Sequence, residues 1–291
     1  MSNQKAAIFI ILGQSNAVGH GIPMQEEDKI LTPLKNVFGL DRRNNQSFDK
    51  AELFWSGYTS CGMNLAEEQD HTYSIPNCLA SLWQKHIDEG NGLNLPDLYI
   101  IQIAIGAEGV TEGYKWHPDR EKKLIPGKLG TVDISLFPFT KHIFSLLDDS
   151  FAKKNMEYEI IGLHWRGGEN DITATDEYLS QNLKNIYVRM FDAFNSALGT
   201  PPIVLHKMVC PDRMMDCDPS GQYLKNMHFI NMVFSELESH YQNISVFDPT
   251  QAPQFVENVR GNGLFIEDAV HFTPAVNAWI AKKVLETYSG L

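Results

Sequence analysis

The residues best suited to chemistry begin with a serine near the start of the chain, within Gly13-Gln14-Ser15-Asn16. This tetrapeptide follows an apolar run at 6–12 that has the length and composition of a buried strand. Ligands of open parallel sheets bind beyond the carboxyl ends of the strands, so the Ser15 hydroxyl is expected to face a cleft as a nucleophile. Helix capping alone is the competing interpretation. The G-x-S-x-G elbow of α/β-hydrolases is not matched, because Ala17 stands where its second glycine belongs.

An aspartate and a histidine three residues apart, Asp268 and His271, come shortly before the last helical pattern. A serine hydroxyl needs a base whose pKa is near 7 to become a nucleophile, and an imidazole suits that role. A carboxylate three residues earlier can fold back within one turn and hold the other ring nitrogen. The spacing therefore predicts His271 as the base and Asp268 as its partner, with a turn aspartate and a structural histidine as the alternative.

Two turns rich in glycine follow other predicted strands, at 106–111 and 166–171. In the first turn, a glycine amide is placed to point at a developing oxyanion. In the second turn, Gly167 and Gly168 allow a backbone to approach a ligand closely, and the charged residues after them are expected at the cleft edge. An ordinary strand-to-helix turn with solvated acids is the alternative. The four segments all fall where one shared cleft would form.

The elements that must position these residues are short apolar runs alternating with helical patterns. Continuous apolarity favours strands that are covered on both faces, and the alternation predicts an α/β fold with a mostly parallel, five-stranded sheet between helices. The predicted strands lie at 6–12, 98–105, 159–165, 202–209 and 244–248, and the predicted helices at 75–89, 136–154, 176–197, 223–241 and 275–288.

Two long stretches, 23–74 and 114–133, do not fit this alternation and are predicted to be excursions that wall a substrate cleft. The chain shows no internal repeat and no linker rich in Pro, Gly or Ser. A single domain over residues 1–291 is therefore expected.

Composition excludes several classes of partner. The net charge of −12 would repel nucleic acid and anionic membrane surfaces. The first apolar run is short for a signal peptide, and no stretch approaches the roughly 20 apolar residues that span a bilayer, so a cytoplasmic protein is expected. The histidines show no metal-ligand spacing, so no metal and no cofactor are predicted. The oligomeric state is not determined by the sequence.

Taken together, the motifs resemble those of SGNH-type hydrolases, especially the branch of sialate O-acetylesterases and of the acetylxylan esterases of carbohydrate esterase family 6. The likeness spans about residues 6–288 and rests on GQSN, G-A-E-G-V-T-x₄-W, W-R-G-G-E-N-D and D-x-x-H. It implies a three-layer α/β/α sandwich with a flavodoxin-like sheet. It also implies a Ser15, His271 and Asp268 triad, with the amides of Ser15 and Gly109 in the oxyanion hole.

The sequence departs from the family pattern at two places. Val110 replaces a glycine, and Gly167 stands where the family carries a glutamine that donates to the oxyanion. Such a donor is worth about 10²–10³ in rate, and Asn16 and Arg166 are the nearby polar substitutes. The residues expected to bind the oxyanion or the substrate are Gly109, Asn16, Gln14, Gly167, Glu169 and Arg166.

The sequence thus predicts a serine esterase that removes small acyl groups, chiefly acetyl, from the hydroxyls of a small carbohydrate or related polyol. Two alternatives remain open. One is a lipid or aryl esterase of the same fold, and the other is a carbohydrate-binding pseudo-esterase, suggested by the missing glutamine.

Overall fold

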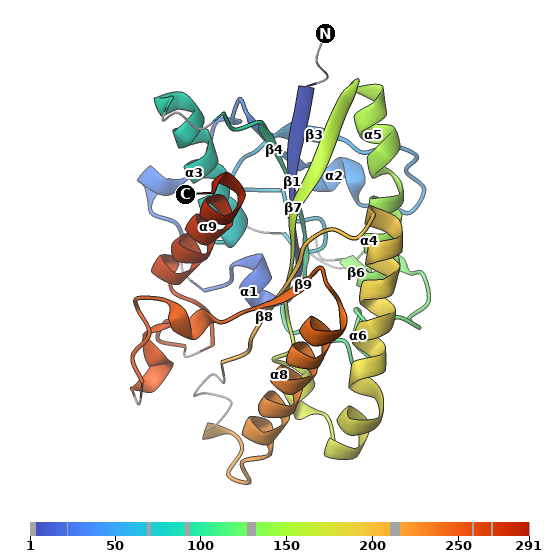
Figure 1. The fold of residues 1–291 in the computed structure, drawn as a ribbon, viewed down its shortest axis with the longest axis vertical. Helices are drawn as coiled ribbons and strands as arrows, with labels where there is room; N and C mark the ends of the chain where they lie inside the picture. The colour runs from blue at the N-terminus through green and yellow to red at the C-terminus, as the bar shows by residue number, and fades with distance from the viewer. Residues whose placement is uncertain are drawn as a thin grey trace.

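The computed structural model describes residues 4–21, 23–68, 71–90, 94–126, 132–209, 216–257, 259–268 and 270–290. Within these residues, a seven-stranded sheet has the strand order β3-β2-β4-β1-β7-β8-β9. Figure 1 shows this sheet nearly edge-on, with helices packed on both of its sides. The predicted α/β class with helix, sheet and helix layers is confirmed.

The five strands predicted from the apolar runs form the parallel centre of the sheet. Taken in chain order they are adjacent as 2-1-3-4-5, which is the flavodoxin-like arrangement. They are β1 (Gln4–Gly13), β4 (Asp97–Ala104), β7 (Met156–Arg166), β8 (Ile203–His206) and β9 (Ile244–Phe247).

The prediction of five strands is wrong in number, because the excursion at 23–74 adds two more. β2 (Val37–Leu40) pairs parallel with β4, and β3 (Trp55–Gly57) pairs antiparallel with β2 at the edge of the sheet. Both strands are three or four residues long and contain a glycine, so neither has the apolar run that identifies a strand in the sequence. Gly39 in β2 packs so tightly that an added Cβ would lie 2.6 Å from the Met63 sulfur.

Two layers of helices cover the sheet, and alternate residues of β1 divide between them. Ala6, Ile8, Ile10 and Leu12 face one core, and Ala7, Phe9 and Ile11 face the other. The first core is covered by α4 (Leu136–Ser145), α5 (Leu147–Lys153), α6 (Asp176–Leu198) and α8 (Gln222–His240), and the second by α1 (Ser15–Val18), α3 (Ile75–Glu89) and α9 (Pro274–Ser289). All predicted helices are present, although 136–154 divides at Leu146 into α4 and α5.

Short elements complete the description. They are α2 (Arg42–Asn45), the antiparallel pair β5 (Leu124–Pro126) and β6 (Val132–Ile134), and the 3₁₀ turns η1 (Glu26–Asp28), η3 (Asp171–Thr173), η4 (Pro249–Gln251) and η5 (Arg260–Gly263). The excursion at 114–133 thus contributes β5 and part of β6 rather than a featureless loop.

The chain leaves β1 toward α1 and α3 on one face, whereas it leaves β7 toward α6 on the other face (Figure 1). Such a divergence between neighbouring parallel strands opens a crevice at their carboxyl ends, which is where ligands bind in doubly wound sheets. Ser15 follows β1 and Gly167 follows β7, so both lie at this point.

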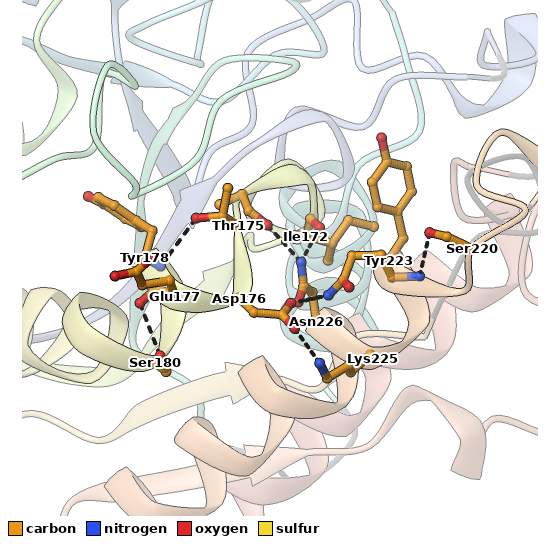
Figure 2. A network of polar contacts seen from close by, with 12 residues as sticks. Ile172, Thr175, Asp176, Glu177, Tyr178, Ser180, Ser220, Tyr223, Lys225 and Asn226 are labelled. Carbon is orange, nitrogen blue, oxygen red and sulfur yellow. Dashed lines mark hydrogen bonds and ion pairs between the residues drawn. The ribbon is translucent and has the colours of Figure 1, made fainter.

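A polar network fixes the turn that follows β7, as Figure 2 shows. Asn226 of α8 donates to the carbonyl oxygens of Ile172 and Ala174 at 2.7 and 2.8 Å. Thr175 caps α6 by accepting from the Tyr178 amide at 3.2 Å, and Asp176 forms an ion pair with Lys225 of α8. The 171–175 turn is therefore held between the starts of α6 and α8.

Candidate active site

Ser15 lies at the junction of β1 and α1, where the backbone is tightly constrained. Gly13 has φ of +142°, and a Cβ added to it would lie 1.8 Å from the carbonyl oxygen of Arg166. The Gln14 amide donates to that same oxygen at 3.0 Å, so the turns after β1 and β7 are joined directly. Ser15 is 8% exposed. Only glycine fits at 13, which explains the first residue of the motif.

Asp268 and His271 form the close pair that their spacing predicted. Asp268 Oδ2 lies 2.5 Å from Nδ1 of the imidazole, while Oδ1 accepts from the amides of Val270 and His271 at 2.9 and 3.0 Å. Burial raises the pKa of Asp268, but these amides and the ring outweigh it and hold the pKa below its ordinary value. The carboxylate is therefore ionised, and it orients the ring so that Nε2 is left for other partners.

Asn16 connects the serine turn to the histidine segment. Its Oδ1 accepts from the Phe272 amide at 2.9 Å, and its Nδ2 donates to the Val270 carbonyl at 3.2 Å. Gly21, which follows α1, also lies close to His271, because a Cβ added to it would be 3.1 Å from the His271 Cβ. The structure thus brings the Ser15 and His271 segments together, although no hydrogen bond joins the two side chains among the described residues.

Beneath the serine turn lies a buried polar cluster centred on Glu169. Its carboxylate accepts from Gln14 Nε2 at 2.5 Å, from Asn16 Nδ2 at 3.4 Å and from the Arg166 guanidinium. The Arg166 guanidinium also lies 4.6 Å from the centre of the Phe272 ring. These side chains therefore fix one another's positions through their mutual hydrogen bonds, without a ligand.

The alternative interpretation of this turn, in which its acids are solvated, is wrong for Glu169, and Arg166 is buried with it. Arg166 is 1% exposed and Glu169 is 4% exposed. A buried guanidinium is tolerated only beside a carboxylate that accepts its protons, and the three-residue spacing provides one. Gln14 and Asn16 donate hydrogen bonds to the same carboxylate. All four polar side chains therefore support the turn that carries Ser15.

Gly109 is confined by the buried carboxylate of Asp171, which is the last residue of the W-R-G-G-E-N-D motif. Asp171 accepts from the amides of Val110 and Thr111 at 3.0 and 2.9 Å, and a Cβ added to Gly109 would lie 2.4 Å from its Oδ1. Burial raises the pKa of Asp171 to about 6, against the opposing effect of these amide hydrogen bonds. Asp171 thereby fixes the backbone around Gly109. The indication of this role in the sequence was the position of Asp171 within the motif that follows the third predicted strand.

Gly167 lies against the indole of Trp165, where an added Cβ would be 3.0 Å from the ring. Trp165 is fully buried and packs edge-on to Trp116, with ring centres 5.1 Å apart. Trp116 donates through Nε1 to the Gly13 carbonyl at 3.0 Å, so it is a core residue that supports the serine turn. A residue larger than glycine at 167 would press on this packed pair.

A second histidine and carboxylate pair, which sequence reasoning missed, lies beside the first. His20 Nε2 is 2.9 Å from Glu67 Oε1, and the rings of His20 and His271 meet edge-on with centres 5.6 Å apart. Glu67 belongs to the excursion predicted to wall the cleft. Because 47 positions separate the two residues, no local spacing could reveal the pair.

The described residues contain no group of three or more His, Cys, Asp or Glu side chains that could hold a metal ion. Among the same residues, no helix has both the length and the apolarity needed to cross a bilayer.

Comparison with known proteins identifies similar folds without a sequence relative. No family model matches the chain, and no curated protein matches it. The structure is similar to NanS, with 14% identity, a TM-score of 0.55 and complete coverage of both chains. It is also similar to a protein from Arabidopsis thaliana, with 14% identity, a TM-score of 0.57 and 97% of each chain covered.

A third similar structure is a carbohydrate acetylesterase from Xanthomonas citri, with 11% identity and a TM-score of 0.52. The match covers 98% of this chain and 57% of that one. At such low identities the three likenesses establish a shared fold.

Proposed function

We propose that this protein is a serine esterase of the SGNH type, in which Ser15, His271 and Asp268 remove acetyl groups from hydroxyls of a carbohydrate or related polyol. The observation that carries the proposal is the His271–Asp268 pair, held 2.5 Å apart next to the serine turn. Asn16 supports it by bonding to the backbone on both sides of His271. The acetylesterase of similar fold is consistent with the same substrate class.

In the proposed reaction, the Ser15 oxygen attacks the ester carbonyl while His271 Nε2 takes its proton. Asp268 stabilises the imidazolium that forms. The protonated ring then gives its proton to the departing alcohol, which leaves an acyl-enzyme. Water attacks the acyl group next and gives a proton to His271, which returns it to the Ser15 oxygen as the bond to the acyl carbon breaks and acetate is released.

The oxyanion is proposed to accept hydrogen bonds from the backbone amides of Ser15 and Gly109. Ser15 is the first residue of α1, where an amide has no partner within the helix. Asp171 fixes the neighbouring amides of Val110 and Thr111 and so orders the Gly109 turn. Gly167 supplies no side-chain donor, so two donors are expected to carry the stabilisation and to leave a modest enzyme.

Turnover of an activated acetyl ester and of an acetylated sugar by the purified protein tests the proposal. Ser15→Ala should lower kcat by about 10³ or more, because it removes the nucleophile. The free energy of unfolding should change by at most about 1–2 kcal/mol, which is the upper limit for a capping hydroxyl, because the N-cap of α1 is Gln14 and not Ser15. The matched control is Ser74→Ala, since Ser74 caps α3 by accepting from the Asn77 amide at 3.3 Å. That variant should lose stability and keep its activity.

Other outcomes select the alternatives. Faster cleavage of octanoyl than of acetyl esters would point to a lipid esterase. Binding of an acetylated sugar without turnover would point to a carbohydrate-binding pseudo-esterase, the role that glycine in place of the family's glutamine at position 167 favours. Full activity in Ser15→Ala would refute the proposed nucleophile.

A further inference from the structure

The His20–Glu67 pair has no part in the reaction just described, although it lies beside the proposed base. Its side chains are 35% and 28% exposed, so both are within reach of a bound ligand. The ring of His20 meets that of His271 at an interplanar angle of 66°. A second polar group at this distance from a catalytic histidine is suitably placed to touch the part of a substrate next to the reacting ester.

The position of His20 is fixed relative to Ser15 by the backbone. Gly19 adopts φ of +90° after α1, and the His20 amide donates to the Ser15 carbonyl at 3.0 Å. On the other side, a Cβ at Gly106 would lie 2.6 Å from the His20 ring, so glycine leaves the space that the ring occupies. His20 therefore lies between the serine turn and the turn after β4.

Glu67 determines which ring nitrogen of His20 carries the proton. Its Oε2 accepts from the Gly106 amide at 2.6 Å while Oε1 faces His20 Nε2. Burial raises the pKa of Glu67, but the hydrogen bonds from His20 and Gly106 and the charge of Arg42 hold that pKa below its ordinary value. An ionised carboxylate only accepts, so Nε2 donates to it, and in the neutral ring Nδ1 is left as an acceptor.

We propose that His20, oriented by Glu67, binds the alcohol portion of the substrate by accepting a hydrogen bond at Nδ1 from a hydroxyl adjacent to the ester. This inference rests on the proposed esterase function and adds the residue that selects hydroxylated substrates. A group that must accept from a substrate hydroxyl discriminates against an analogue lacking it, because the acceptor is then left without a partner.

The test compares two acetyl esters of one sugar, the first with free neighbouring hydroxyls and the second with those hydroxyls methylated. Wild type should prefer the first, and His20→Phe should lower the ratio of the two kcat/KM values by about tenfold, mainly through KM. This is the fold-change expected for one net hydrogen bond. His86→Phe, which changes an α3 histidine bonded to the Leu82 carbonyl at 2.9 Å, serves as the control and should leave the ratio unchanged.

Glu67→Gln tests the orienting role without changing the size of the side chain. A carboxamide can donate to Nε2, which moves the ring proton to Nδ1 and converts the acceptor into a donor. The variant should therefore reproduce most of the loss of selectivity. Equal loss of kcat on both esters in His20→Phe would overturn the proposal, since it would assign His20 to proton transfer. An unchanged ratio would overturn it equally.

Binding separates failure of this inference from failure of the esterase proposal. In the Ser15→Ala background, the Kd of the hydroxylated sugar acetate, measured by calorimetry, should rise about tenfold when His20→Phe is added. An absence of Ser15-dependent turnover together with this rise would reject the esterase and keep the ligand site. Unchanged affinity would reject the His20 contact whatever the turnover.

Discussion

Two pairs of residues at the same end of the sheet, His271 with Asp268 and His164 with His206, differ in their surroundings. His271 is partly exposed in the segment before α9 and has the Asp268 carboxylate on Nδ1. His164 of β7 and His206 of β8 are buried and bond to each other, with Nδ1 and Nε2 2.9 Å apart. Burial lowers the pKa of His164 to about 3 and that of His206 well below its ordinary value.

The difference shows that the surroundings of a histidine decide whether it can act as a base. A ring that is buried without a carboxylate resists protonation and contributes packing and one hydrogen bond. A ring with a carboxylate on one nitrogen and access to solvent on the other can receive a proton and return it. The Arg166–Glu169 cluster connects the two regions. The charge of Arg166 contributes to the lowered pKa of His206, and Glu169 accepts a hydrogen bond from Asn16.

The largest expected effect comes from removing the carboxylate that distinguishes the two pairs. Asp268→Asn should lower kcat/KM for an acetyl ester by up to about 10⁴, because an amide favours the wrong tautomer of His271. A spectrophotometric assay of an activated acetate, with a melting curve, measures both activity and folding. Asp176→Asn is the matched control, since it removes a carboxylate paired with Lys225 and should leave activity unchanged. Wild-type rates in Asp268→Asn would show that the carboxylate is not needed.

The next effect tests the cluster between the two regions. Glu169→Gln leaves the Arg166 charge buried without its counterion and places a third carboxamide beside those of Gln14 and Asn16. The free energy of unfolding should fall by about 3–5 kcal/mol, as for other broken buried pairs. Denaturant unfolding measures it.

The control for that measurement is Glu286→Gln, which removes a carboxylate that pairs at the surface with Lys283, at the same three-residue spacing, and with Lys282. That change should cost about 0–1 kcal/mol. If both variants lose equally little, burial does not set the strength of the Arg166–Glu169 pair.

The smallest effect concerns the core pair and the pH dependence of stability. Because folding lowers the pKa of both rings, the unfolded chain binds more protons below about pH 6.5, and the free energy of unfolding falls as the pH drops. His206→Phe removes one of these groups. Its free energy of unfolding should depend on pH less steeply between pH 4 and 6, by up to about 1.4 kcal/mol per pH unit.

Urea unfolding at several pH values measures this slope. Phe247→Leu is the control, since it alters a ring 5.1 Å from His206 without removing a titrating group. It should lower stability by a similar amount at every pH. Parallel curves for wild type and His206→Phe would contradict the assignment of His206 as a neutral core residue.

Some of the architecture was predictable because its signals are local. The five continuous apolar runs gave the parallel strands, since strands covered on both faces need apolar residues on both sides. β2 was missed because it pairs with β4, which lies about 60 positions further along the chain, and β3 was missed because it pairs with β2. Strands of three or four residues carry too few side chains to show a pattern of their own.

The site divides in the same way. Asp268 and His271 were predictable as a pair because one turn of backbone brings them together, whichever fold surrounds them. The inward direction of Gln14 and Arg166 was not, because the same residue types are common on exposed turns and only burial beside Glu169 distinguishes the cases. His20 and Glu67 meet only through the folded excursion.

The sequence by itself therefore determined the α/β class, the central strands and the His271–Asp268 pair, because each depends on neighbours within a few residues. Tertiary structure alone decided which polar residues are buried. It alone decided which histidines contact a carboxylate and remain exposed to solvent. It also decided that Asp171 lies where a Gly109 side chain would be. The physical reason is that burial and the charges around a group are set by chain segments distant in sequence, and these govern whether a polar side chain supports the fold or faces a ligand.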